Sequence, residues 1–409
     1  MKSLVKGVAL ISSGVALGHI ISLLAQPVLT RLFTPAQFGV YSLYLTLTAL
    51  LIPVVSLSFP YLIFYATDKG GKREVIQLSK LFLYIYFIFS TALLLFSFFL
   101  QWYSDNLVLF AASLLNAVLM SYILLNQLIF VDEGKLKTRG ILHVGMIISI
   151  ALGKIISHYF VFDDKSMIFG HLLLLFAFTI IIWILFDERR LPKYTQLRNI
   201  NSDYWSFSKY KTFTGLLSAL SVSLPIFAIS FYHGQSSVGL YGLAYTVAFA
   251  PALLIGTAVY EVSLRELKSR RLKKLRIPFI KLSLFFALFV LLGLIVCGFL
   301  LMYGSYIFSF IFGVDWQKSS EYAAYMVLWV FGSLGSRPFN ALATVYNLEK
   351  HNSFIEVIAI LIRVLVLGAA GVIFTSPLAL VLWFSVANIF INIARIYILK
   401  YYFPGVVNA

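Results

Sequence analysis

Apolar residues occur in long runs along the whole chain, and short polar connections separate these runs. A helix of about 20 apolar residues spans the hydrocarbon core of a bilayer, so each run predicts a transmembrane helix. The strands of a membrane barrel would instead alternate apolar and polar positions. We therefore predict an all-α integral membrane protein with about twelve transmembrane helices. The predicted spans are 8–30, 38–64, 79–100, 106–130, 141–162, 167–186, 208–231, 237–260, 279–302, 322–346, 354–374 and 378–400.

Local signals mark several ends of these spans. Thr34 and Pro35 offer a cap and a first-turn proline to the second span. Asp105 can cap the fourth span, and Ser376-Pro377 opens the twelfth. The first run is too long for a signal peptide and has no clear small-residue cleavage pattern, so we read it as a retained helix.

Basic residues gather in alternate connections, which predicts the orientation in the membrane. One set of alternate connections holds few basic residues, namely Arg31, Lys165 and Lys318. Cytoplasmic connections carry the excess of Lys and Arg, so the richer set is predicted to be cytoplasmic, with both chain termini inside. The richer set holds Lys2, Lys6, Lys69, Lys72, Arg73, Lys80, Lys135, Lys137, Arg139, Arg189, Arg190, Lys193, Arg198, Lys209, Lys211, Arg265, Lys268, Arg270, Arg271, Lys273, Lys274, Arg276, Lys281, Lys350 and Lys400.

Composition agrees with a membrane protein and excludes a soluble one. The 409 residues are 61% hydrophobic and 12% charged, and the mean hydropathy is +0.92. Soluble domains are about 45–50% apolar and about 25% charged. The formal net charge of +16 comes from basic residues between apolar spans. Such residues meet anionic lipid headgroups, so we expect membrane lipids as partners and no nucleic acid.

A sequence repeat divides the predicted spans into two sets of six. "PVLTRLFTPAQFGVYSLYLTLTALLIPVV" is followed about two hundred residues later by "PIFAISFYHGQSSVGLYGLAYTVAFAPALL". Pro27 matches Pro225, Gly39-Val40-Tyr41 matches Gly239-Leu240-Tyr241, and Pro53 matches Pro251. Parallel repeats of this kind occur in transporters. We predict two six-helix lobes around a central cleft, 1–197 and 198–409, with the boundary in the basic segment 187–207.

Charged residues within the predicted spans are few and mostly positive. Lys154, Arg337 and Arg363 lie at membrane depth, Glu356 lies seven residues before Arg363, and Arg31 ends the first span. A charge at the bilayer centre costs about 2.5–3.5 kcal/mol on insertion scales, so these groups are expected to face a cavity or a partner. Lys154 and Arg337 have no acid at helical spacing on their own span, which favours a functional role for both.

Polar side chains recur at helical spacing on four of these spans. Lipid cannot satisfy amides, so these faces are expected to look inward, with the first and seventh spans lining the cleft. The faces comprise Ser12, His19, Gln26 and Thr30; Thr214, Ser218 and Ser221; Arg337, Asn340, Thr344 and Asn347; and Ser385, Asn388, Asn392 and Arg395.

Structural roles are the alternatives for most of these residues. Serine, threonine and asparagine often join membrane helices by hydrogen bonds. Arg395 can reach the inner headgroups, and Arg31 can anchor its helix at the interface. Glu356 and Arg363 share a helix face and could form a structural ion pair. His19 is either a helix contact or a proton carrier.

The chemistry of the predicted cleft favours an anionic, sugar-bearing ligand. Cationic groups in a low-dielectric wall offer charge-assisted hydrogen bonds to phosphate. Hydroxyls and amides on the same faces suit sugars, which makes His19, Gln26 and Asn340 candidate contacts. The scarcity of buried carboxylates argues against a cationic drug as cargo. Glu356 is the one good candidate for ion coupling, and we expect no metal site and no cofactor.

The stretch "PVLTRLFTPAQFGVYSLYLTL", the twelve spans and the repeat resemble the Wzx-type polysaccharide (O-antigen) repeat-unit flippases of the multidrug/oligosaccharidyl-lipid/polysaccharide exporter superfamily. The architectural resemblance covers the whole chain. Arg31 occupies the matching motif position, and the family implies a cationic central cavity. Many relatives carry an acid between the positions of Pro35 and Phe38, where this chain has Ala36-Gln37, so no role of that acid is carried over.

The resemblance implies a transporter that moves undecaprenyl-diphosphate-linked oligosaccharide from the inner to the outer leaflet of a bacterial inner membrane by alternating access. A polysaccharide polymerase is then a candidate partner. We expect the diphosphate to bind Lys154, Arg337 and Arg363. The alternatives are a multidrug antiporter of the same superfamily, which would need an essential buried acid, and a membrane polymerase or ligase. The predicted outer connection 303–321 is short for such an enzyme, so we predict a protein without enzymatic activity.

Overall fold

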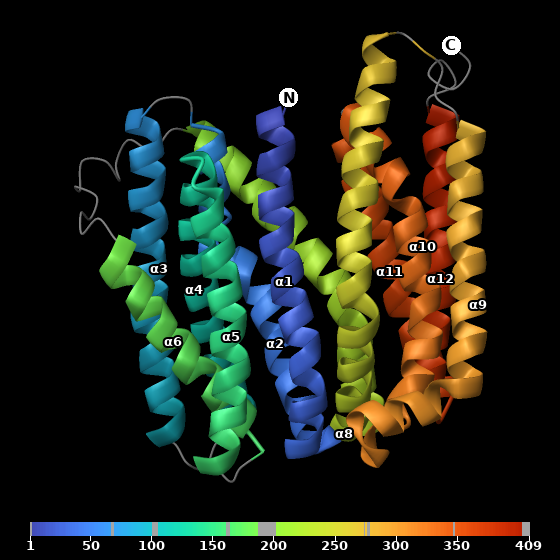
Figure 1. Cartoon of the computed structure of the whole chain (residues 1–409), viewed down its shortest axis with the longest axis horizontal. Coiled ribbons are helices and arrows are strands. Elements are labelled where there is room, and N and C mark those ends of the chain that lie inside the picture. The colour runs from blue at the N-terminus through green and yellow to red at the C-terminus, as the bar shows by residue number, and fades with distance from the viewer. Residues whose placement is uncertain are drawn as a thin grey trace. The chain divides into compact units, whose positions relative to one another are not determined.

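The computed structural model describes the backbone of residues 2–66, 69–99, 105–160, 164–186, 202–273, 275, 279–346 and 348–402. It describes the side chains of residues 14–66, 70–97, 106–160, 164–186, 204–273, 275, 279–346, 348 and 353–401. Every regular element in this part of the chain is a helix (Figure 1). The fold is therefore the all-α membrane fold that the apolar runs predict.

The elements follow the predicted spans closely in order and position. They are α1 (Lys2–Leu32), α2 (Pro35–Ser56), η1 (Phe59–Phe64), α3 (Lys69–Phe99), α4 (Asp105–Asp132), α5 (Leu136–Phe160), α6 (Ser166–Phe186), α8 (Ser202–Leu272), α9 (Phe279–Phe312), η2 (Val314–Trp316), α10 (Ser319–Val345), α11 (Glu349–Ile373) and α12 (Pro377–Tyr402).

Ten helices of the described chain are long and apolar enough to cross a membrane. One of these is α8, which contains two predicted spans and breaks between them at Gly234, where φ is +77°. The helix α10 lies where the tenth span is predicted but is less apolar and is not among the ten. The number twelve accordingly remains a prediction, while the multi-pass membrane architecture is established.

The second predicted span was too long at its C-terminal end. It should reach residue 64, but α2 stops at Ser56. Leu57 and Ser58 then take positive φ angles of 46° and 52°, and a separate 3-10 helix follows. Hydropathy could not reveal this break, because Phe59–Phe64 is as apolar as the helix before it.

Two other predicted connections are partly helical. Residues 261–272 continue α8 as a helix that carries several of the basic side chains. Residues 303–312 continue α9, which shortens the outer connection predicted at 303–321 to the segment before α10. Helices extend past the hydrocarbon core because backbone hydrogen bonding, unlike hydropathy, does not stop at its edge.

The start of α2 confirms the cap predicted at Thr34-Pro35. The backbone N–H of Thr34 donates to Gln37 Oε1 at 3.0 Å, and the N–H of Gln37 donates to Thr34 Oγ1 at 3.4 Å. This reciprocal pair is a capping box, which satisfies two N–H groups at a helix start. Gln37 thus performs the cap with a neutral side chain.

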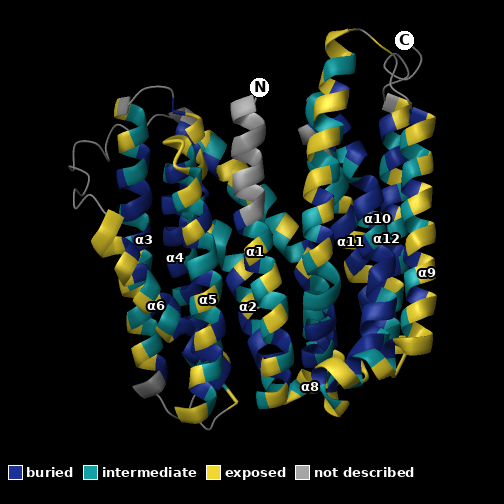
Figure 2. Ribbon diagram, viewed as in Figure 1, coloured by how far each residue is buried: buried dark blue, intermediate teal, exposed yellow. Residues whose placement is uncertain are grey.

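The chain divides into two compact units. Unit 1 contains residues 1–25 and 40–220, and unit 2 contains residues 26–39 and 221–409. The boundary predicted near residue 197 lies outside the described residues. Within unit 1, α4 is buried along most of its length, and within unit 2 the same holds for α10 (Figure 2).

The repeated glycines contact each other's segments inside unit 2. A Cβ atom on Gly39 would overlap the carbonyl oxygen of Gln235, and a Cβ atom on Gly239 would overlap that of Pro35. Each glycine therefore meets the residue four positions before its counterpart. This reciprocal contact is what a repeated segment produces when two copies cross at their closest approach, where only glycine fits.

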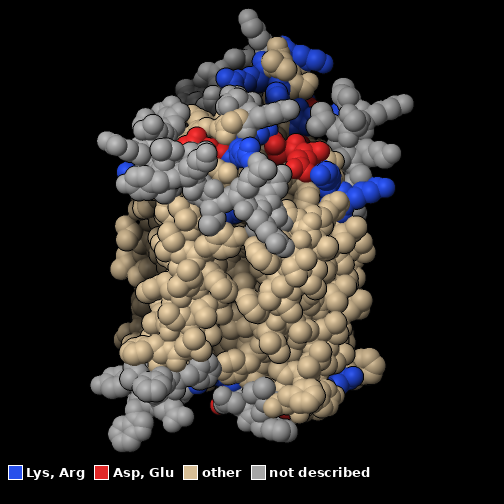
Figure 3. Space-filling model, turned by 90° about the vertical axis from the view of Figure 1, so that its left-hand side faces the viewer, with Lys and Arg blue, Asp and Glu red and all other residues tan. Residues whose placement is uncertain are grey.

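Charged side chains avoid the middle of the face shown in Figure 3. A broad uncharged band separates Lys, Arg, Asp and Glu at one end from fewer charged groups at the other. Exposed large apolar side chains occur on most of the helices, including Ile88 on α3 and Phe310 on α9. Apolar surface of this extent is stable in lipid and not in water.

Candidate functional site

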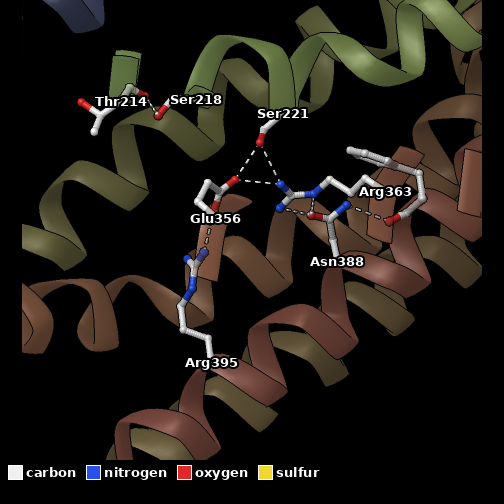
Figure 4. A network of polar contacts seen from close by, with 8 residues as sticks. Thr214, Ser218, Ser221, Glu356, Arg363, Asn388 and Arg395 are labelled. Atoms are coloured by element: carbon white, nitrogen blue, oxygen red, sulfur yellow. Dashed lines mark hydrogen bonds and ion pairs between the residues drawn. The ribbon is translucent and has the colours of Figure 1, made fainter. Parts of the chain in front are cut away.

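A buried ionic network around Glu356 connects α8, α11 and α12 in unit 2 (Figure 4). Glu356 Oε1 accepts from Arg363 Nη1 at 2.7 Å, and Glu356 Oε2 accepts from Arg395 Nη2 at 2.7 Å. The two arginine side chains are only 9% and 11% exposed. The structural ion pair between Glu356 and Arg363 is thus confirmed, while Arg395, which could have reached the headgroups, turns to the same carboxylate.

Two neutral side chains complete the coordination of Arg363. Its Nη1 donates to Ser221 Oγ at 2.8 Å, and its Nε and Nη2 donate to Asn388 Oδ1 at 3.1 and 2.9 Å. Ser221 Oγ in turn donates to Glu356 Oε1 at 2.7 Å. The hydroxyls of Thr214 and Ser218, by contrast, bond to carbonyls of their own helix α8.

Helical spacing brings these groups together. Glu356 and Arg363 are seven residues apart on α11, and Asn388 and Arg395 are seven residues apart on α12. Seven residues are two turns, so each pair lies on one face. The facing pairs put two amphipathic stripes in contact, and Ser221 joins them from α8.

The network carries one positive charge more than its carboxylate neutralises: two arginines against one glutamate give +1. Arg395 Nε is buried without a hydrogen-bond partner among the described residues. A buried excess charge is costly, and a second anion would relieve that cost. Glu356 Oε1 accepts two hydrogen bonds and Oε2 accepts one, and the two guanidinium groups already neutralise the charge that would attract a cation.

A second polar cluster lies on one face of α10. Arg337, Asn340 and Thr344 follow at offsets of three and four residues. Arg337 is half-buried, and its Nε has no hydrogen-bond partner among the described residues, nor has Asn340 Oδ1. The guanidinium lies beside Gly256 of α8, where a Cβ atom would stand 3.1 Å from Nε. Tyr260 of α8 bonds to Thr344 Oγ1 at 3.1 Å.

Lys154 lies inside unit 1 and is 7% exposed. Its ammonium stands 4.9 Å from the centroid of the Tyr41 ring, and the hydroxyl of Tyr41 bonds to His171 Nδ1 at 2.8 Å. The adjoining glycines explain this placement, because Gly153 on α5 and Gly170 on α6 meet backbone to backbone. Their close approach draws Lys154 and His171 into one buried space, and no described acid forms an ion pair with Lys154.

The remaining predicted site residues are more scattered. Arg31 is exposed at the end of α1, and Gln26 is buried. His19 is half-buried in unit 1, where His143 packs against the neighbouring Gly18. Ser12 and Asn347, from two of the predicted polar faces, lie outside the residues whose side chains are described.

The structure therefore joins the predicted residues into three groups: Glu356 with Arg363, Arg337 with Asn340, and Lys154 with new partners. Sequence reasoning missed Tyr41, His171 and Tyr260, because aromatic residues in apolar spans carry no periodic signal. The glycines preceding Lys154 and His171 are a signal that could have found one of these contacts. Among the described residues, no group of three or more His, Cys, Asp or Glu side chains could hold a metal ion.

Comparison with known proteins agrees with this architecture. Residues 28–321 match the family described as "Polysaccharide biosynthesis protein". A search of curated protein sequences gave no significant match.

Solved structures of transporters share the fold. "Lipid II flippase MurJ, inward closed conformation" aligns with a TM-score of 0.71 and 14% identity, over 97% of this chain and 87% of that one. A MOP superfamily transporter from Pyrococcus furiosus, described as having reverse polarity of its binding pocket, aligns with a TM-score of 0.61 and 15% identity, over 97% and 95%. An outward-facing multidrug resistance MATE family transporter aligns with a TM-score of 0.59 and 16% identity, over 99% of this chain and 97% of that one.

The family match covers more than half of the chain, and the three transporter structures share its fold over nearly its whole length. The chain belongs to the polysaccharide biosynthesis protein family, with the fold of the MOP superfamily transporters.

Proposed function

We propose that this protein is a flippase that moves undecaprenyl-diphosphate-linked oligosaccharide from the cytoplasmic to the outer leaflet of a bacterial inner membrane. The observation that carries the proposal is Arg337, a half-buried cation whose Nε has no hydrogen-bond partner among the described residues, as is true of Asn340 Oδ1 three positions later on α10. A guanidinium suits a diphosphate, because its N–H groups fork onto phosphate oxygens. The amide oxygen of Asn340 suits a sugar hydroxyl.

The excess charge of the Glu356 network offers a second contact for the diphosphate. Glu356 acts in this scheme as a resident counterion to Arg363 and Arg395. A substrate phosphate can replace it on either arginine, so charge stays balanced while the substrate passes. Lys154 supplies a further uncompensated cation, and Arg31, His19 and Gln26 remain proposed contacts along the first helix.

The transport step we propose is alternating access between two halves, residues 1–197 and 198–409, with both termini cytoplasmic. A ligand biases such a cycle only by binding one state more tightly than the other. The prenyl chain stays in lipid. No chemical step is proposed, since the fold is shared with transporters.

The multidrug alternative is less well supported. It requires a buried acid that binds a cation, and Glu356 is the acid in question. Its two oxygens already accept from two arginines, which disfavours that role. We therefore withdraw Glu356 as the coupling candidate and propose it as a counterion.

The experiment is a leaflet-resolved assay of lipid-linked sugar in cells that lack this protein. Wild type should relieve a build-up on the cytoplasmic side. Arg337→Gln should lower the rate of relief about tenfold or more, because a hydrogen bond to a charged group contributes about 1.5–3 kcal/mol. Arg270→Gln is the matched control, since Arg270 is half-exposed and pairs with Glu266 of its own helix.

Two results would contradict the proposal. A build-up of sugar already in the outer leaflet would make the protein an enzyme or its accessory. Full relief by Arg337→Gln would remove Arg337 from the site, even if the protein still flips the lipid.

A further inference from the structure

Four polar side chains from three helices of unit 1 form a buried group, which we call the Lys154 cluster. Tyr41 and Tyr44 lie on α2, Lys154 on α5 and His171 on α6. The rings of Tyr44 and His171 stand edge to face with centroids 5.4 Å apart, and the centroid of the Tyr41 ring is 5.8 Å from each of them. The ammonium of Lys154 stands 4.9 Å from the Tyr41 centroid.

The cluster is enclosed by protein. Tyr44 is 0% exposed, His171 1% and Lys154 7%. The backbone contact of Gly153 with Gly170 closes the space next to Lys154 and His171. A charge in such a low-dielectric interior is stable only when an opposite charge compensates it.

Hydrogen-bond donors outnumber acceptors in the Lys154 cluster. An ammonium has three N–H groups, and no acid in the described part of the chain pairs with Lys154. The hydroxyl of Tyr44 is buried and has no partner among the described residues. Tyr41 and His171 share one bond, at Nδ1, so one O–H or N–H of the neutral pair stays unused in either tautomer. The other ring nitrogen, His171 Nε2, is likewise buried without a described partner.

The ligand that this group of donors requires is a small anion. An anion would accept charge-assisted hydrogen bonds and would also neutralise the ammonium. Water could accept hydrogen bonds but would leave the charge in place, and so would Asn116 Oδ1, a neutral unpartnered acceptor on α4. Side chains this deeply buried leave room for few added atoms, which favours a monatomic anion over a phosphate.

We propose that the Lys154 cluster binds a chloride ion. Lys154 supplies the charge, and the hydroxyl of Tyr44 and the unused donor of the Tyr41–His171 pair complete the contacts. The chloride is then the counterion of Lys154, just as Glu356 is the counterion of two arginines in unit 2. A substrate phosphate displaces it when the cluster opens during transport. This last step rests on the proposed function, whereas chloride binding does not.

The test is thermal unfolding of the purified full-length protein in detergent while chloride replaces gluconate at constant ionic strength. A ligand at about ten times its Kd raises the ratio of folded to unfolded protein about tenfold. We expect this gain in wild type and none in Lys154→Met, which should exceed wild type in unfolding temperature most clearly without chloride. Lys137→Met is the matched control, because Lys137 is an exposed lysine of the same helix and should keep the full chloride response.

Tyr44→Phe separates an anion site from a purely structural cluster. The variant deletes a buried hydroxyl that has no described partner, so a structural role predicts equal or higher stability in either salt. The proposal predicts instead that the Kd for chloride rises about tenfold, because one hydrogen bond to a charged group is lost. Equilibrium dialysis with radioactive chloride measures this Kd and should detect a bound ion that Lys154→Met lacks.

Three outcomes would overturn the proposal. Wild type that does not respond to chloride would mean that the cluster holds water. A full chloride response in Lys154→Met would mean that the ion binds elsewhere. Stabilisation by phosphate but not by chloride, lost in Lys154→Met, would assign Lys154 to the transport substrate directly. A negative leaflet assay would contradict only the displacement by substrate, because chloride binding is measured without transport.

Discussion

At the scale of single residues, the stability of a charged side chain in the membrane interior depends on the partners that compensate its charge. Glu356 has two arginines, while Lys154 has an aromatic ring and no paired acid among the described residues. Low dielectric raises the cost of leaving such groups uncompensated. Removing the charge should therefore lower the stability of the protein at Glu356 and raise it at Lys154.

Removing the carboxylate of Glu356 should destabilise the protein. Glu356→Gln leaves two buried guanidinium groups without a counterion, and breaking a buried pair in this way costs about 3–5 kcal/mol. Thermal unfolding in detergent measures the loss. Glu266→Gln, at an exposed pair with Arg270, is the control and should change stability by about 0–1 kcal/mol. Equal effects of the two variants would show that the network is not structural.

Removing the charge of Lys154 should stabilise the protein. Lys154→Met keeps the length of the side chain and deletes an uncompensated charge, which costs about 2.5–3.5 kcal/mol at the bilayer centre. We expect a higher unfolding temperature together with lost transport. A variant that is less stable yet transports normally would make Lys154 a packing residue held by Tyr41.

At the scale of elements, close backbone contacts decide which helices can touch. The reciprocal contact of Gly39 and Gly239 leaves no room for a methyl group, as does the contact of Gly153 with Gly170. The sequence repeat marked the first pair as equivalent but could not show that the two copies meet. That contact depends on how the chain returns after two hundred residues.

Alanine at these glycines tests the contact. Gly39→Ala and Gly239→Ala should each lower stability by about 1–3 kcal/mol or more, because the new methyl group meets a backbone carbonyl that cannot move aside. Gly298→Ala and Gly368→Ala are matched controls, since both positions are helical and open to space. Fluorescence-detected gel filtration after heating compares the four. If all four behaved alike, the helix crossing would be looser than described.

Element boundaries show where sequence patterns lose their information. The cap at Thr34 was predicted, because it depends on local hydrogen bonds between neighbours in sequence, although the part of Gln37 in it was not. The break at Leu57-Ser58 was not, because the residues on both sides are equally apolar. Helical continuation through 261–272 and 303–312 was also missed. Backbone hydrogen bonding carries a helix past the edge of the hydrocarbon core, and the length of an apolar span does not show how far.

At the scale of the whole molecule, the ten long apolar helices of the described chain and the uncharged band on the face in Figure 3 indicate a membrane protein without fixing its direction. The excess of basic residues in alternate connections predicts that the termini and the end of α8 are cytoplasmic. The same rule puts Lys318, before α10, outside.

Thiol labelling tests this orientation. Cys297 is buried and is the only native cysteine, so Cys297→Ser provides a clean background. In intact cells, a membrane-impermeant maleimide should label Lys318→Cys and should label Lys268→Cys only after the membrane is opened. Both side chains are exposed, so access depends on the side of the membrane. Labelling in the opposite order would reverse the predicted topology.

The sequence by itself determined the all-helical membrane fold, the order of the helices and the kind of charge buried in them. These follow from hydropathy, spacing and capping, which act between residues close in the chain. Tertiary structure decided which charges are paired. Glu356 could be matched with Arg363 by spacing alone, but Arg395 and Ser221 reach Glu356, and Asn388 reaches Arg363, from other helices. The burial of Lys154 beneath Tyr41 likewise required two glycines distant in sequence to meet, because close packing is a property of neighbours in space.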